Sequence, residues 1–127
     1  MKLLTDEMIQ GAIDRNPEYK VMPHVSILPV ACKACLLGIC AVDAGFLEGD
    51  GLADYHPTAE RMGKQIGLDA YYSWGVAYGF DHRTAHCKTH PSWATRPSFR
   101  QGVAVGQKWR EKLGYPMTRD NAAEATP

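Results

Sequence analysis

The chain has 127 residues, of which 45% are hydrophobic and 22% are charged, and its formal net charge is zero. This composition excludes a disordered chain and a strongly acidic or basic protein, and the length suits one hydrophobic core. The longest apolar run, Ala34 to Val42, is much shorter than the roughly 20 residues that cross a bilayer, and Asp6 and Glu7 interrupt the start before a signal sequence can form. We therefore expect a cytoplasmic protein without a membrane span.

The first predicted helix covers residues 6–15. Thr5 is a suitable N-cap, and Asp6 and Glu7 place negative charge in the first turn, where the helix dipole favours it. Apolar residues then recur at helical spacing until Asn16-Pro17, which ends the helix.

A second helix is predicted over residues 30–44, with Pro29 at its start and Gly45 as its stop. Nearly all of its residues are apolar, so we expect it to be the buried central helix of the fold. A third helix is predicted over residues 57–66, because Pro57 suits a first turn and Gly67 suits a C-terminal stop.

The two remaining predicted helices are residues 70–80 and 98–113. Asp69 is a suitable N-cap for the fourth helix, which contains most of the aromatic residues. The sequence from Ser98 to Gln101 fits the capping-box pattern at the start of the fifth helix.

Together these elements predict an all-α fold, a bundle of about five helices with a helix-turn-helix-like hairpin in the middle. We expect residues 1–116 to form a single domain and the small, polar residues 117–127 to form a flexible tail.

Two pairs of glycines share one spacing on the fourth and fifth predicted helices. They are Gly75 with Gly79 and Gly102 with Gly106. A glycine inside a helix costs about 1 kcal/mol relative to alanine. The repeated spacing therefore predicts a close approach of two backbones, between these two helices or, alternatively, at a dimer face.

Cysteine and histidine residues form two groups that suit zinc. Cys32-Lys-Ala-Cys35 separates two thiols by two residues, which lets both reach one tetrahedral ion. The second group is His82, His86, Cys87 and His90. Together the groups predict one zinc site. The alternative is that the cysteines are buried core residues and the histidines lie in a surface loop.

The segment 58–74 resembles a helix-turn-helix. The residues that match its core, turn and second-helix cap are Met62, Gly63, Ile66, Gly67, Leu68 and Asp69. The resemblance implies DNA binding, but residues 70–80 contain no Lys, Arg, Asn or Gln to contact phosphates or bases. Ser73 also stands where the family usually buries an aliphatic residue. We therefore expect this helix to be a core helix.

Charge is distributed unevenly along the chain. Acidic residues dominate residues 46–81, and Lys and Arg dominate residues 82–119. The basic part predicts an alternative function, nucleic-acid binding, through Arg96, Arg100, Lys108, Arg110 and Lys112. The other interpretation is that the two segments neutralise each other within the fold or across a dimer.

The sequence contains none of the common catalytic motifs, such as G-x-S-x-G, a P-loop, H-E-x-x-H or G-x-G-x-x-G. Cys87 stands beside His86, but neighbours in sequence seldom have the geometry of a nucleophile and its base. We therefore predict no enzymatic activity and no organic cofactor, with zinc as the one cofactor that the sequence suggests.

Aromatic residues gather on and after the fourth predicted helix. Their number exceeds what a small core easily hides, and Tyr and Trp are enriched at protein interfaces. We predict an interface formed by Tyr71, Tyr72, Trp74, Tyr78 and Trp93. The alternative is a helix buried on all sides.

A further resemblance concerns the stretch from Ile66-Gly-Leu through Trp74-Gly-Val to Tyr78-Gly-Phe-Asp81, followed by the paired glycines of the fifth helix. It is similar to small uncharacterised helical proteins of bacteria and their phages. The resemblance implies an accessory protein that acts by binding a macromolecule.

These observations predict a small, non-enzymatic binding or regulatory protein that acts on another protein and associates with itself, as a homodimer. The alternative is a zinc-stabilised helical domain that binds nucleic acid through its basic C-terminal third.

Overall fold

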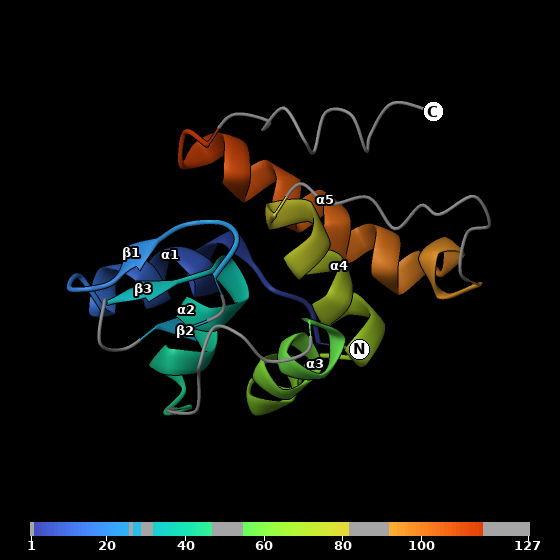
Figure 1. The fold of residues 1–127 in the computed structure, drawn as a ribbon, viewed down its shortest axis with the longest axis horizontal. Coiled ribbons are helices and arrows are strands. Elements are labelled where there is room, and N and C mark those ends of the chain that lie inside the picture. The colour runs from blue at the N-terminus through green and yellow to red at the C-terminus, as the bar shows by residue number, and fades with distance from the viewer. Residues whose placement is uncertain (1, 26, 29–31, 47–54, 82–91, 116–127) are drawn as a thin grey trace.

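The computed structural model describes residues 2–25, 27–28, 32–46, 55–81 and 92–115. The described helices are α1 (Asp6–Arg15), α2 (Leu36–Asp43), α3 (Tyr55–Gln65), α4 (Ala70–Phe80) and α5 (Pro97–Lys112), with a short 3₁₀ helix, η1 (Ser92–Thr95), before α5 (Figure 1). The mostly helical architecture confirms the predicted all-α fold. None of these helices combines the length and the apolar character that a membrane span needs.

Helix α1 has the predicted ends. The Thr5 hydroxyl accepts a hydrogen bond from the Met8 backbone N–H at 3.1 Å, and Asn16 is the C-cap. Ile9 and Ala12 are buried on its inner face. Arg15 in the last turn pairs with Asp43 of α2 at 2.6 Å, so α1 and α2 are joined at the surface as well as in the core.

Helix α2 is shorter than predicted, because the chain is not helical before Leu36. Cys32 has a left-handed backbone with φ of 52°, which no α-helix contains. Cys35 is the N-cap, and its sulfur accepts a hydrogen bond from the Gly38 N–H at 3.1 Å. The prediction that residues 30–35 are helical is therefore wrong for the described residues 32–35.

A small sheet takes the place of the predicted start of this helix. Its strands are β1 (Lys20–Val21), β2 (Ile27–Leu28) and β3 (Lys33–Ala34). The central strand β3 is parallel to β1 and antiparallel to β2. Strands of two residues are too short to show an alternating pattern, so the sequence gives no periodic sign of them.

Helices α3 and α4 form the predicted hairpin. Gly67 follows α3 with φ of 79°, and the Asp69 carboxylate caps α4 by accepting the Tyr72 N–H at 3.2 Å. Ser73 is fully buried here, and a methyl group at Gly63 would overlap its hydroxyl oxygen. The close approach of α3 therefore explains why a small residue occupies position 73.

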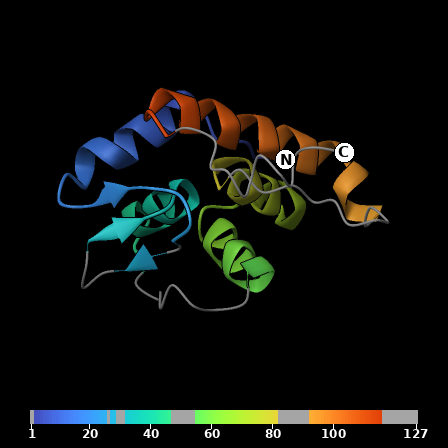
Figure 2. The same ribbon diagram turned by 45° about the horizontal axis from the view of Figure 1, so that its top comes forward.

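Helices α4 and α5 lie side by side along much of their length (Figures 1 and 2). A methyl group at Gly75 or Gly79 would overlap a backbone carbonyl oxygen of α5, and one at Gly102 or Gly106 would overlap a carbonyl oxygen of α4. The predicted close contact between these two helices is confirmed. All four glycines are needed because each faces backbone atoms rather than side chains.

The start of α5 differs from the predicted capping box. Arg96 is the N-cap and makes no side-chain capping hydrogen bond, and Pro97 is the first helical residue. Ser98 therefore lies inside the first turn, two positions after the N-cap. Proline at this position favours helix initiation because its fixed φ suits the helix and it has no N–H to satisfy.

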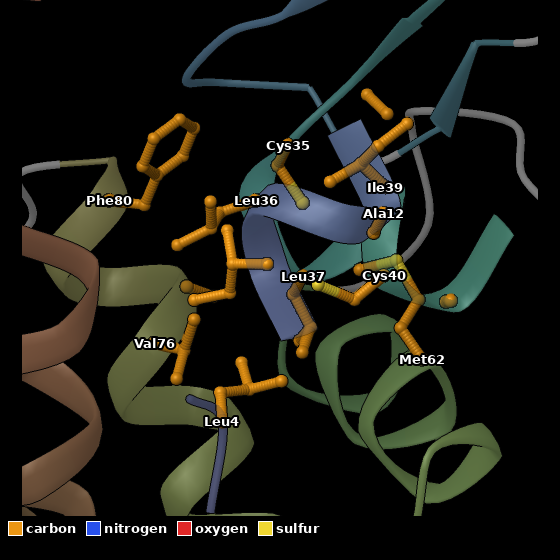
Figure 3. Close-up of a cluster of buried hydrophobic side chains, with 14 of the residues drawn as sticks. Leu4, Ala12, Cys35, Leu36, Leu37, Ile39, Cys40, Met62, Val76 and Phe80 are labelled. Atoms are coloured by element: carbon orange, nitrogen blue, oxygen red, sulfur yellow. The ribbon is translucent and has the colours of Figure 1, made fainter. Parts of the chain in front are cut away.

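The hydrophobic core lies around α2, as the sequence predicts. Leu36, Leu37 and Ile39 are fully buried, and Val76 and Phe80 of α4 are fully buried in the same cluster (Figure 3). Helix α2 is apolar on nearly every side and is buried from Leu36 to Ala41, and it contacts α1, β3, α3 and α4.

Candidate protein-binding surface

Six aromatic side chains from four elements form one cluster. We call it the aromatic patch, and its members are His56 of α3, Tyr71, Trp74 and Tyr78 of α4, Trp93 of η1 and Phe99 of α5. Every member lies within 5.7 Å, centroid to centroid, of at least one other ring. The cluster joins the α3–α4 hairpin to η1 and α5.

His56 lies at the centre of the aromatic patch. Its ring stacks on Trp74 with centroids 4.6 Å apart and planes 18° apart, and it meets Trp93 edge to face at 4.9 Å and 87°. Its Nε2 shares a hydrogen bond of 2.7 Å with the Tyr78 hydroxyl. The His56 backbone oxygen accepts the Trp74 indole N–H at 3.1 Å. Both the ring and the backbone of His56 are therefore held by α4.

Trp93 closes the patch from η1. It meets Phe99 at 5.1 Å and Trp74 at 5.4 Å, each nearly perpendicular. Edge-to-face pairs of this kind stabilise by about 0.5–1.5 kcal/mol beyond their area burial. Phe99 is 4% exposed and fixes this end of the patch to α5.

The patch is buried at its base and half-exposed at its rim. Tyr78 and Phe99 are buried, whereas His56, Tyr71, Trp74 and Trp93 are half-buried. Amphipathic aromatic side chains in this position offer large contact area to a partner at low entropic cost. The rim therefore has the residue types of an interface core.

The structure brings together four of the five predicted interface residues and leaves out Tyr72. Tyr72 is 1% exposed, and its hydroxyl accepts the Leu4 backbone N–H at 3.0 Å. Burial raises its pKa. The prediction that Tyr72 belongs to an interface conflicts with this position in the core, and its place on a different side of α4 from Trp74 is the physical reason.

Sequence reasoning missed His56 and Phe99. His56 stands beside a helix-starting proline and has no local feature that marks an aromatic environment. Phe99 lies on α5, and its contact with Trp93 depends on the position of η1. The contacts that place His56 and Phe99 in the aromatic patch are made with residues of other helices, so the local sequence does not reveal them.

Two arginines border the aromatic patch. The Arg96 guanidinium carbon lies 4.4 Å from the centroid of the Tyr71 ring, a cation–π contact. Arg100 follows one turn later on α5, and both arginines are exposed.

The other three predicted nucleic-acid residues lie elsewhere. Lys108 pairs with Asp6 at 2.6 Å, and Lys112 lies over the Trp109 ring at 4.2 Å. Arg110 is only 3% exposed and donates to the Phe80 carbonyl oxygen at 2.7 Å, and burial lowers its pKa. Because Arg110 is buried and Lys108 is already paired, the five residues do not form one basic surface.

The predicted zinc residues can be placed only in part. His82, His86, Cys87 and His90 lie outside the described residues. Cys35 is buried, and burial raises the pKa of its thiol to about 12, while Cys32 is half-buried. Zinc binding at Cys35 would require this buried thiol to release its proton. Among the described residues, no group of three His, Cys, Asp or Glu could hold a metal ion.

Helix α4 does not have the exposure of a DNA-recognition helix. Most of its residues, from Tyr72 to Phe80, are buried, and its two glycines face α5. This confirms the prediction that it is a core helix of a helix-turn-helix-like hairpin.

Comparison with known proteins gives no relative: no protein-family model, no curated protein and no solved structure matches this chain.

Proposed function

We propose that this chain is a small, non-enzymatic protein of the cytoplasm that binds another protein through the aromatic patch and associates with itself through the same surface. The observation that carries the proposal is the half-exposed rim formed by Tyr71, Trp74 and Trp93, with Arg96 stacked on Tyr71. Trp, Tyr and Arg are the residues that contribute most to binding energy at protein interfaces.

The construction of the patch supports this proposal. Its base, Tyr78 and Phe99, is fixed by burial between α4 and α5, so the rim is held on a rigid support. Rigid aromatic groups lose little entropy on binding.

Self-association tests the proposal directly. We expect sedimentation velocity of the full chain to show a sedimentation coefficient that rises with protein concentration, and we expect Trp93→Ser to sediment as a monomer at the same concentrations. Far-UV circular dichroism would verify that the variant is folded. A wild-type chain that stays monomeric, or a folded Trp93→Ser variant that associates as well as the wild type, would contradict the proposed self-association.

Leu3→Ser is the matched control. Leu3 is the most exposed large hydrophobic side chain in the described part of the chain, at 43%, and it does not belong to the patch. Loss of association in this variant too would point to general stickiness rather than to the aromatic patch.

The alternative, a zinc-stabilised domain that binds nucleic acid, stays a prediction. Its histidines lie outside the described residues. Of its basic residues, Arg96 and Arg100 are exposed without an acidic partner among the described residues, and these two border the aromatic patch.

A further inference from the structure

We propose that the partner presents an acidic segment to the aromatic patch, and that Arg96 and Arg100 bind its carboxylates while Trp93 packs against an apolar side chain beside them. This inference rests on the proposed function, because it names the chemistry of the partner at the same surface.

Arg96 is oriented for this role. Its guanidinium lies over the Tyr71 ring, with 4.4 Å between the guanidinium carbon and the ring centroid. An arginine that stacks on a ring keeps the N–H groups at its edge available. These groups match a carboxylate in a two-bond arrangement, which is stronger and more directional than the single contact of a lysine. Stacking on Tyr71 therefore fixes the side chain before the partner arrives.

Arg96 and Arg100 differ from two other exposed cations of the fold, Arg15 and Lys108. Arg15 is paired with Asp43 and Lys108 with Asp6, each at 2.6 Å. Within the described ranges, neither Arg96 nor Arg100 has an acidic partner. Arg96 is the N-cap of α5, and Arg100 lies in the first turn, where its N–H donates to the Arg96 carbonyl oxygen at 3.1 Å. The result is an unneutralised positive pair at the edge of an apolar surface.

Among the described residues, the acidic side chains closest in sequence to the patch make no ion pair with Arg96 or Arg100. Asp69 is the nearest in sequence to Tyr71, and its carboxylate caps α4 by accepting the Tyr72 N–H at 3.2 Å. Glu60 is exposed on α3, one turn beyond His56. Charge complementarity therefore favours a partner that supplies carboxylates.

A protein segment fits better than single-stranded nucleic acid. Binding of nucleic acid would need open ring faces for the bases and several cations for the phosphates. In the patch, His56 stacks on Trp74, and Arg96 covers one face of Tyr71. Two arginines supply few phosphate contacts. A carboxylate can bind to the N–H groups at the edges of the two arginines. An apolar side chain of the same segment can pack against the half-exposed rim of the patch.

A random peptide library displayed on phage tests the chemistry of the partner without knowing its identity. The full chain is immobilised, and bound peptides are selected in parallel on the wild type, on Trp93→Ser and on the double variant Arg96→Gln, Arg100→Gln. We expect the wild type to enrich peptides rich in Asp and Glu with an apolar residue beside them, and we expect the double variant to lose this enrichment.

The outcomes separate the inference from the proposed function. Wild-type selections that enrich peptides absent from Trp93→Ser, but without an excess of acidic residues, would overturn the inference and leave the protein-binding function standing. Selections that do not differ between the wild type and Trp93→Ser would overturn both. Enrichment of Lys and Arg would overturn the inference by indicating the opposite charge.

The strongest selected peptide then allows a quantitative test by fluorescence anisotropy. We expect Arg96→Lys to weaken its binding about tenfold, because charge is kept but the stacked, two-bond geometry is lost. Lys64→Gln removes an exposed charge at the far end of α3 and is the matched control, with no change expected. A labelled twelve-nucleotide oligo-dT that binds more tightly than the peptide would overturn the inference in favour of nucleic acid.

Discussion

Helix α4 contacts the rest of the molecule in two opposite ways. Toward α5 it presents Gly75 and Gly79, and no side chain separates the two backbones. Toward His56 of α3 and Trp93 of η1 it presents Trp74 and Tyr78, whose rings pack against both residues. The glycine contact leaves no room for variation or for a ligand, whereas the aromatic side ends in a half-exposed rim. One contact therefore serves as the scaffold, and the other is open to a partner.

The largest expected effect comes from breaking the scaffold. Gly79→Val would drive its side chain into the Val103 carbonyl oxygen, and a backbone atom of a packed helix has little freedom to move. We expect the free energy of unfolding, measured by urea denaturation, to fall by about 3 kcal/mol or more.

Ala104→Val is the matched control for this substitution, because Ala104 is an exposed residue of α5. We expect it to change stability by less than about 1 kcal/mol, the difference in helix propensity. A Gly79→Val variant as stable as Ala104→Val would show that the two helices tolerate separation.

A moderate effect distinguishes the core tyrosine of α4 from its neighbour at the rim. Tyr72→Phe removes the hydroxyl that accepts the Leu4 N–H and leaves that buried donor unpaired. We expect a loss of about 1–2 kcal/mol in the free energy of unfolding. For Tyr71→Phe, whose hydroxyl makes no hydrogen bond among the described residues, we expect almost none. Equal losses would contradict the assignment of Tyr72 to the core and Tyr71 to the rim.

The smallest expected effect is a change in how stability depends on pH under acidic conditions. Hydrogen bonds from Lys108 and then Trp109 lower the pKa of Asp6, and the Arg15 hydrogen bond lowers that of Asp43. A lowered pKa in the folded state means that the contribution to stability is present at neutral pH and is lost as pH falls below about 4, the ordinary pKa of aspartate.

Thermal unfolding midpoints between pH 7 and pH 3 test this expectation. The midpoint of Asp6→Asn should fall less steeply with pH than that of the wild type, because one of the two linked carboxylates is gone. The Asp6 side chain is 51% exposed, so the change should be small and weaker in high salt. Parallel curves for the two proteins would show that Asp6 does not contribute.

The C-terminal helices were predictable because their signals are local. Asp69 and Gly67 mark the ends of helices through conformations and hydrogen bonds that lie within one turn. The two glycine pairs have the same spacing, which indicates that the two helices contact each other there. The region from Lys20 to Cys35 was not predictable. Its strands have two residues each and are stabilised by pairing with strands elsewhere in the segment. Cys32 has a left-handed backbone conformation, which its residue type does not predict.

The sequence predicted the three aromatic residues of α4 that belong to the patch, but it did not indicate their contacts with residues of other elements. The sequence places Tyr71, Trp74 and Tyr78 on one side of a helix, since their spacing is local. It does not indicate that His56 lies between Trp74 and Trp93, because that position depends on the docking of α3 and η1. The same limit applies to Arg110, a basic residue that helix packing buries.

The indole N–H signals of the three tryptophans offer the most direct test of the difference between scaffold and rim. Trp109 is fully buried and bonded to Asp6, whereas Trp93 is half-buried at the rim. In a dilution series of ¹⁵N-labelled protein followed by NMR, we expect the Trp93 signal to shift with concentration and the Trp109 signal to stay in place. Concentration-dependent shifts at Trp109 with none at Trp93 would contradict a partner-binding surface at the aromatic patch.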